Sequence, residues 1–71
     1  MMYISRHPVR NNEFDIYGSA MIKIGDILRK PEGDGWLYTA NLYKPARTET
    51  AHKFKDVARL ILDGSSYTYL G

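Results

Sequence analysis

The chain has 71 residues, so we expect a single domain over residues 1–71 with little room for a deep catalytic cleft. Ten Lys and Arg against eight Asp and Glu leave a net charge of +2, which favours an anionic partner only slightly. The absence of cysteine excludes disulfides and thiolate metal sites, and it favours a reducing cytoplasm as the location.

The N-terminal part of the chain predicts a hairpin. Residues 2–5 and 13–17 are each the length of a short strand, and Phe14 and Ile16 alternate with Asp15 and Tyr17 as in a half-buried strand. Asn11-Asn12 is typical of the turn between them. Residues 1–8 lack a signal-peptide core, and no apolar run approaches a membrane span, so we expect no membrane partner.

Residues 21–30 fit either a strand or a helix. Ile22 and Ile24 alternate with Lys23 as in a strand, whereas Ile24, Ile27 and Leu28 fit helical spacing equally well. Gly25-Asp26 weakens both elements and is typical of a bulge or a tight corner. The interpretation we prefer is a strand kinked at Gly25.

Residues 31–43 predict a tight turn followed by a strand. Glu32-Gly33-Asp34-Gly35 is the turn, because two glycines permit the positive backbone angles of a reversal. The strand ends before Lys44-Pro45-Ala46-Arg47, since proline cannot continue a sheet ladder. The less polar face of this strand is expected to meet the core and carries Trp36, Tyr38, Ala40 and Leu42. The opposite face carries Leu37, Thr39, Asn41 and Tyr43.

A stripe of apolar residues predicts a helix over residues 49–63. The stripe consists of Ala51, Phe54, Val57, Ala58 and Ile61. Thr48 or Thr50 would cap the first turn, Glu49 suits the positive end of the helix dipole, and Gly64 lies where a left-handed stop is expected. The solvated face would carry His52, Lys55, Asp56, Arg59 and Asp63. The tail, residues 66–70, can add one more short strand.

These elements together predict an α+β fold, in which an antiparallel sheet of three or four strands carries one C-terminal helix on one face. The expected core consists of Phe14, Ile22, Ile24, Trp36, Tyr38, Leu42, Phe54, Val57, Ala58 and Ile61.

No group of residues has the spacing of a catalytic or metal-binding motif. His7 and His52 are the only histidines, and neither has a second His or a Cys nearby. Gly33 and Gly35 precede a strand, whereas a phosphate-binding loop must open a helix. We therefore expect a protein that is not an enzyme and that uses neither a cofactor nor a metal ion.

The functional signal that remains is basic and aromatic. Five cations occur within sixteen positions that hold only Glu49 and Asp56 as acids: Lys44, Arg47, Lys53, Lys55 and Arg59. Several small domains bind nucleic acid through an exposed sheet face with a basic rim, by stacking and phosphate contact. We therefore predict a nucleic-acid-binding module in which these cations contact phosphate. Leu37, Thr39, Asn41 and Tyr43 would form the sheet face of the interface, with Asn41 and Tyr43 against the bases.

Two other interpretations stay open. One is that the charges simply solvate the helix, since Asp56 and Asp63 dilute them. The other is that the free sheet face binds a protein or a second copy of the chain, as a homodimer, adaptor or inhibitor would. Candidate residues for that surface are Leu37, Tyr43, Tyr17, Tyr67 and Tyr69.

Two local patterns resemble known families. Ile22-Lys23-Ile24-Gly25-Asp26-Ile27-Leu28, followed by Gly35-Trp36-Leu37-Tyr38-Thr39-Ala40, resembles the middle of a Src-homology-3-like barrel, where Gly-Asp precedes one strand and Gly-Trp begins the next. That resemblance ends at the predicted helix. The order of strands, a Gly-Trp strand and one helix also resembles the three-stranded-sheet-plus-helix DNA-binding domains of phage integrase arms. In that family the sheet enters the major groove, which implies DNA contacts on the face of Leu37 to Tyr43. A chain this small also suits an accessory protein of a bacterium or phage.

Overall fold

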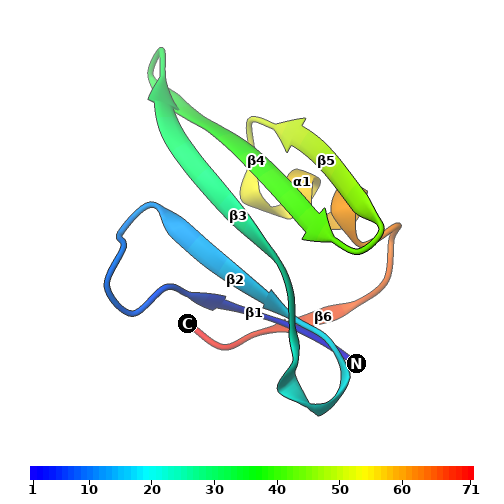
Figure 1. Ribbon diagram of the computed structural model, residues 1–71. Coiled ribbons are helices and arrows are strands. Elements are labelled where there is room, and N and C mark those ends of the chain that lie inside the picture. Colours follow the sequence, from blue (N-terminus) through cyan, green and yellow to red (C-terminus); the bar gives the residue numbers. More distant parts are fainter.

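Six strands form one sheet in the computed structural model, which describes all 71 residues (Figure 1). The strands are β1 (Met2–Arg6), β2 (Glu13–Tyr17), β3 (Lys23–Glu32), β4 (Gly35–Tyr43), β5 (Ala46–Ala51) and β6 (Tyr67–Tyr69). A 3-10 turn, Ser19–Met21, precedes β3, and one helix, α1 (Phe54–Ile61), follows β5. The strand order is β5-β4-β3-β2-β1-β6, with β6 parallel to β1 and every other pair antiparallel.

Glycine positions shape the middle of the sheet as the sequence predicts. Gly33 has a positive φ of 58° and forms the two-residue turn between β3 and β4 with Asp34. The strand interpretation of residues 21–30 is confirmed from Lys23 onward, and the register between β2 and β3 shifts next to Gly25, between Ile16 and Tyr17 of β2. At Gly25 a β-carbon would overlap the backbone carbonyl of Asn41. Only glycine allows β3 and β4 to approach this closely.

The prediction of three or four strands is wrong, since the sheet has six. The predicted tail strand is present as β6, and residues 46–51, read partly as the start of the helix, form β5. Lys44-Pro45 is the turn that folds β5 back on β4, with Tyr43 paired to Ala46. Thr48 and Thr50 are β-branched and face away from the helix, an arrangement that favours a strand. The sequence favoured a helix here because Ala51 fits both the apolar stripe of the helix and the alternation of the strand.

The helix begins later than predicted, at Phe54 rather than Glu49. Its N-cap is Lys53, which makes no side-chain capping bond, so neither Thr48 nor Thr50 is the cap. The predicted left-handed stop is confirmed: Gly64 has φ +78°, and its N–H donates to the carbonyl of Arg59 at 2.9 Å. This eight-residue helix, the only α-helix of the chain, is too short and too polar to cross a membrane.

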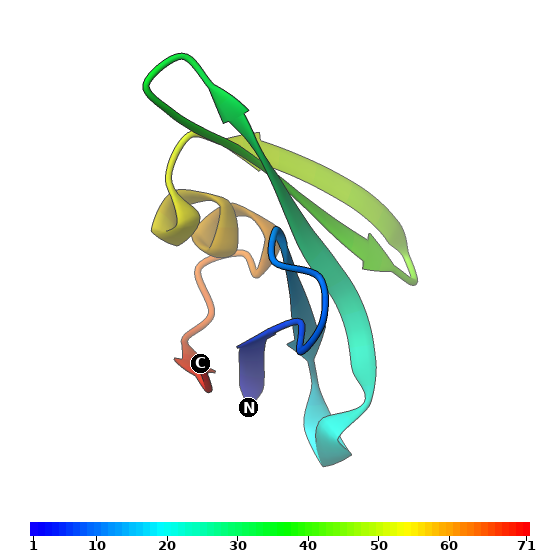
Figure 2. The same cartoon turned by 90° about the vertical axis from the view of Figure 1, so that its left-hand side faces the viewer.

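The sheet is strongly bent around the helix. Figure 2 shows α1 and β6 on the same, concave side of the bent sheet. The helix packs on β4 and β5, yet the ring of Phe54 lies 5.7 Å from the ring of Tyr69 on β6, at the opposite edge of the sheet. The bend therefore brings β6 close to the helix that packs on β4 and β5, and it leaves a hollow between α1 and the strands of the N-terminal half.

The core lies on this concave side, which we call the inner face. Of the predicted core residues, five are buried: Phe14, Tyr38, Val57, Ala58 and Ile61. Four others are partly buried against them: Ile24, Trp36, Leu42 and Phe54. Ile22 is 63% exposed and does not belong to the core, because it precedes β3, at the end of the 3-10 turn. Ala40, predicted to lie on the core-facing side of its strand, is also buried, and the buried apolar residues that the prediction left out are Ile4, Ile16, Ile27 and Leu62.

Candidate functional site

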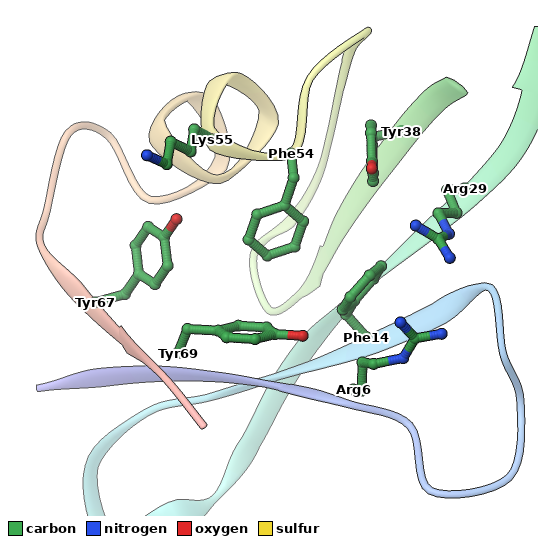
Figure 3. A pocket seen from close by; sticks show the side chains of 8 residues that line it. All are labelled: Arg6, Phe14, Arg29, Tyr38, Phe54, Lys55, Tyr67 and Tyr69. Atoms are coloured by element: carbon green, nitrogen blue, oxygen red, sulfur yellow. The ribbon is translucent and has the colours of Figure 1, made fainter. Parts of the chain in front are cut away.

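A pocket of about 340 Å³ opens on the inner face, and aromatic side chains form most of its wall (Figure 3). The strand register explains why they converge: Phe14 on β2 points to the same face as Tyr38 on β4, and β6 adds two tyrosines beside Met2 and Ile4 of β1. The aromatic residues of the wall are Phe14, Tyr38, Phe54, Tyr67 and Tyr69.

Phe54 is the centre of this aromatic cluster. Its ring centroid lies 5.0 Å from that of Phe14, 5.9 Å from that of Tyr38 and 6.4 Å from that of Tyr67. All these contacts are tilted or edge-on, as aromatic pairs prefer. Phe54 therefore joins the aromatic side chains of β2, β4 and β6 into one cluster.

Three cations complete the pocket wall, and no acidic residue lines it. Arg6 and Arg29 lie at one end, with guanidinium carbons 5.9 Å and 5.7 Å from the ring centroid of Phe14. Lys55 lies at the other end, beside Tyr67 (Figure 3). Arg29 also stacks on Trp36 at 4.1 Å. The pocket thus combines an apolar, aromatic interior with positive charge at both ends.

The loop between β1 and β2 holds the two arginines in place without neutralising them. Arg6 Nη2 donates to the backbone carbonyl of Asn11 at 2.9 Å, and Arg29 Nε donates to Asn12 Oδ1 at 3.3 Å. These acceptors are uncharged, and no carboxylate lies within ion-pair distance of Arg6, Arg29 or Lys55. Their charge is therefore available to an anionic ligand.

The other surface of the sheet, the outer face, carries a polar network. Asp15 and Asp26 stand directly opposite each other on β2 and β3, a pairing that is unfavourable unless it is bridged. Lys23 Nζ lies 3.0 Å from Asp15 Oδ1, and Asp26 accepts hydrogen bonds from Tyr43 Oη at 2.9 Å and Asn41 Nδ2 at 3.2 Å. The polar groups of Asn41 and Tyr43 are thus used within the sheet, beside carboxylates.

The same contacts shift two pKa values upward. The contact with Asp15 raises the pKa of Lys23 above its usual 10.5, because it stabilises the charged ammonium. Burial, followed by the hydrogen bond to Asp26, raises the pKa of Tyr43 above its usual 10.0.

The structure does not bring the nine predicted contact residues to one surface. Leu37, Thr39, Asn41 and Tyr43 lie on the outer face, as the alternation predicts. Lys44 is exposed in the turn after β4, and Lys53 is exposed before α1. Lys55 and Arg59 lie together on the exposed side of α1 and beside the inner-face pocket. The outer-face residues and the helix cations therefore belong to opposite sides of the molecule.

The guanidinium of Arg47 is bound to groups within the protein. It lies on the inner face of β5, where Nη2 donates to the carbonyl of Leu60 at 2.7 Å and Nη1 contacts Asp63 at 2.9 Å. Its contacts with Asp63 and Glu49 raise its pKa further, so it is always charged. Arg47 therefore neutralises the negative end of the helix dipole.

Both histidines also have local partners. His52 Nε2 lies 2.7 Å from Glu32 Oε1, and His7 Nδ1 accepts the N–H groups of Val9 and Arg10. Nowhere in the chain do three His, Asp or Glu side chains gather as a metal-ligand group.

Most residues of the inner-face pocket are not among the contact residues that the sequence predicts. Arg29 lies two residues after the buried Ile27, so strand alternation alone would place it on the core face. Tyr67 and Tyr69 alternate in the same way, whereas the sequence predicts them on the free sheet face. Arg6 carries the same signal, since it lies two residues after the buried Ile4 and pairs with Phe14.

No protein-family model, curated protein or solved structure matches this chain. The two resemblances noted from the sequence accordingly stay predictions.

Proposed function

We propose that this protein is a non-enzymatic nucleic-acid-binding module that takes an unpaired base into the inner-face pocket. The observation that carries the proposal is the combination of five aromatic residues and three cations without carboxylate partners around one hollow. Stacking on aromatic rings and contact with phosphate are the two interactions by which small domains bind single strands.

The shape of the pocket favours a single strand over a duplex. A volume of about 340 Å³ is near the lower end of the range of small-molecule sites, so it suits one planar group. The faces of bases in a duplex are stacked on one another and cannot enter such a hollow. The bases of a single strand can turn outward and stack on Phe54 or Tyr69, while the backbone passes the arginines or Lys55.

The test is a titration of labelled single-stranded DNA and RNA at low salt, followed by fluorescence anisotropy, with matched duplexes for comparison. We expect single strands to bind more tightly and the affinity to fall steeply with salt, as phosphate contacts require. Trp36 is the only tryptophan and lies under Arg29, so its fluorescence should change on binding. Absence of binding to any nucleic acid at low salt would refute the proposal.

Substitution of one tyrosine on each face of the sheet tests which face binds the nucleic acid. Tyr69 on the inner face is 47% exposed and Tyr43 on the outer face is 49% exposed. We expect Tyr69→Ala to weaken binding by about 1–3 kcal/mol, the usual value of one stacked base, and Tyr43→Ala to leave affinity unchanged. The reverse result would place the interface on the outer sheet face, as the sequence alone predicts.

Self-association is the second candidate, and the free edge of β5 supports it. Six residues of β5 have a strand partner on one side only, and Thr48 and Thr50 are exposed along it. An unpaired edge of this kind can pair with a second copy. Sedimentation at increasing protein concentration tests this: a constant monomer mass would refute the homodimer.

A further inference from the structure

A second hollow of about 290 Å³ adjoins the aromatic pocket and shares two of its residues, Lys55 and Tyr67. Beyond these it is lined by Arg59 and by the loop after the helix, Gly64-Ser65-Ser66. The two hollows are therefore consecutive along one path, which runs from Arg6 and Arg29 past the aromatic rings to Arg59.

The chemistry of the second hollow differs from that of the first. Lys55 and Arg59 are one helical turn apart, so their side chains lie on the same side of α1. Neither is paired with a carboxylate, and no acidic residue lines the hollow. The hydroxyls of Ser65 and Ser66 make no hydrogen bond within the protein, whereas the N–H groups of Gly64 and Ser65 are used in ending the helix. Two cations and two free hydroxyls suit a phosphate group.

The end of a helix ordinarily repels an anion, because its free carbonyls carry partial negative charge. Here Arg47 donates to the carbonyls of Leu60 and Ile61 and pairs with Asp63. The carboxylate of Asp63 and the carbonyls of Leu60 and Ile61, which precede residues 64–66 in the chain, are thus already bound to a cation. Arg47 therefore reduces the repulsion that an anion beside residues 64–66 would meet from the negative end of the helix.

We propose that the two hollows form one groove, in which the aromatic pocket takes a base and the Lys55–Arg59–Ser66 hollow takes the phosphodiester that follows it in the strand. The ligand is then a single strand of at least two nucleotides. This inference rests on the proposed function, because it assigns the next group of the same ligand.

The test uses a short single-stranded oligonucleotide in which one phosphodiester at a time is replaced by an uncharged methylphosphonate. At one position the replacement should lower the affinity of the wild-type protein by about threefold to tenfold, as loss of one phosphate contact does. The Arg59→Gln variant should lose a similar amount on the unmodified strand, reduce the salt slope by about one, and become insensitive to the replacement at that position. Lys44→Gln, which removes a cation of the β4–β5 turn, should change none of these.

Folding and the proposed function are checked separately. Arg59 and Lys44 are exposed, so both variants should keep the wild-type circular dichroism and melting temperature. If Arg59→Gln binds with the wild-type affinity and salt slope while Tyr69→Ala weakens binding, the second hollow is not a phosphate site, although the proposed function stands. If no oligonucleotide binds, both fail. Amide shifts of Ser65 and Ser66 on titration should accompany binding, and their absence would likewise contradict the groove.

Discussion

At the scale of single residues, the polar groups of this protein divide into those that hold the fold and those without internal partners. Lys23 belongs to the first group. Asp15 is buried at 6% exposure, and its Oδ1 receives no hydrogen bond of good geometry, so the ammonium of Lys23 is what balances its charge. A buried carboxylate that loses its counterion is costly.

The Lys23→Gln substitution should therefore destabilise the protein by about 1–3 kcal/mol, as leaving a buried polar group unsatisfied does. Urea unfolding followed by circular dichroism measures this difference. Lys30→Gln is the matched control, because Lys30 lies on the outer face of the same strand and has no carboxylate partner. Equal stability of the two variants would show that the Asp15–Lys23 pair contributes nothing.

The difference between charged side chains with and without internal partners also explains how much of the site the sequence could predict. Lys55 and Arg59 could be predicted as surface cations from helical spacing alone. The sequence could not predict that Arg47 binds the C-terminal end of the helix. Its partners at residues 60, 61 and 63 depend on how α1 lies across β5. Residue type gives the charge, but only packing decides whether that charge is free.

At the scale of the elements, strand alternation and turn chemistry predicted most of the sheet. The N-terminal hairpin, the kink at Gly25, the two faces of β4 and the tail strand follow from patterns of a few residues. The predicted start of the helix was wrong because residues 46–51 fit both the helical period of 3.6 and the strand period of 2 over a short window. The six-strand order and the parallel pairing of β6 with β1 depend on contacts between distant segments, which local patterns do not encode.

The Gly25→Ala substitution tests the close approach of β3 and β4. A β-carbon at this position would overlap the backbone of Asn41 and lie 3.1 Å from Leu42 Cδ2. We expect a loss of about 1–3 kcal/mol or more, because the strands must separate. Gly35→Ala is the control, since a β-carbon there meets nothing within 4 Å. A Gly25→Ala protein with wild-type stability in urea would refute the argument.

At the scale of the whole molecule, charge is distributed unevenly between the two faces of the sheet. The outer face carries Asp15 and Asp26 with their partners, whereas the cations around the inner hollows have no carboxylate partners. A net charge of only +2 hides this separation, which is why composition alone favoured an anionic partner so weakly. The bend of the sheet creates the separation by gathering Arg6, Arg29 and Lys55 around one pocket.

The outer-face network should also set how stability depends on pH. Lys23 and Tyr43 both have a pKa raised above the unfolded values of 10.5 and 10.0, so the folded protein keeps these protons to higher pH than the unfolded chain does. Where the folded state binds more protons, stability falls as pH rises. The stabilisation that these two groups give the folded state is therefore fully present below about pH 10 and is lost as pH rises through the folded pKa values.

Urea midpoints measured at intervals from pH 8 to pH 12 should show this decline, and the Lys23→Gln/Tyr43→Phe double variant should show a shallower one. A wild-type midpoint that stays constant or rises above pH 10, or an equally steep decline in the double variant, would mean that these two groups do not link folding to protonation.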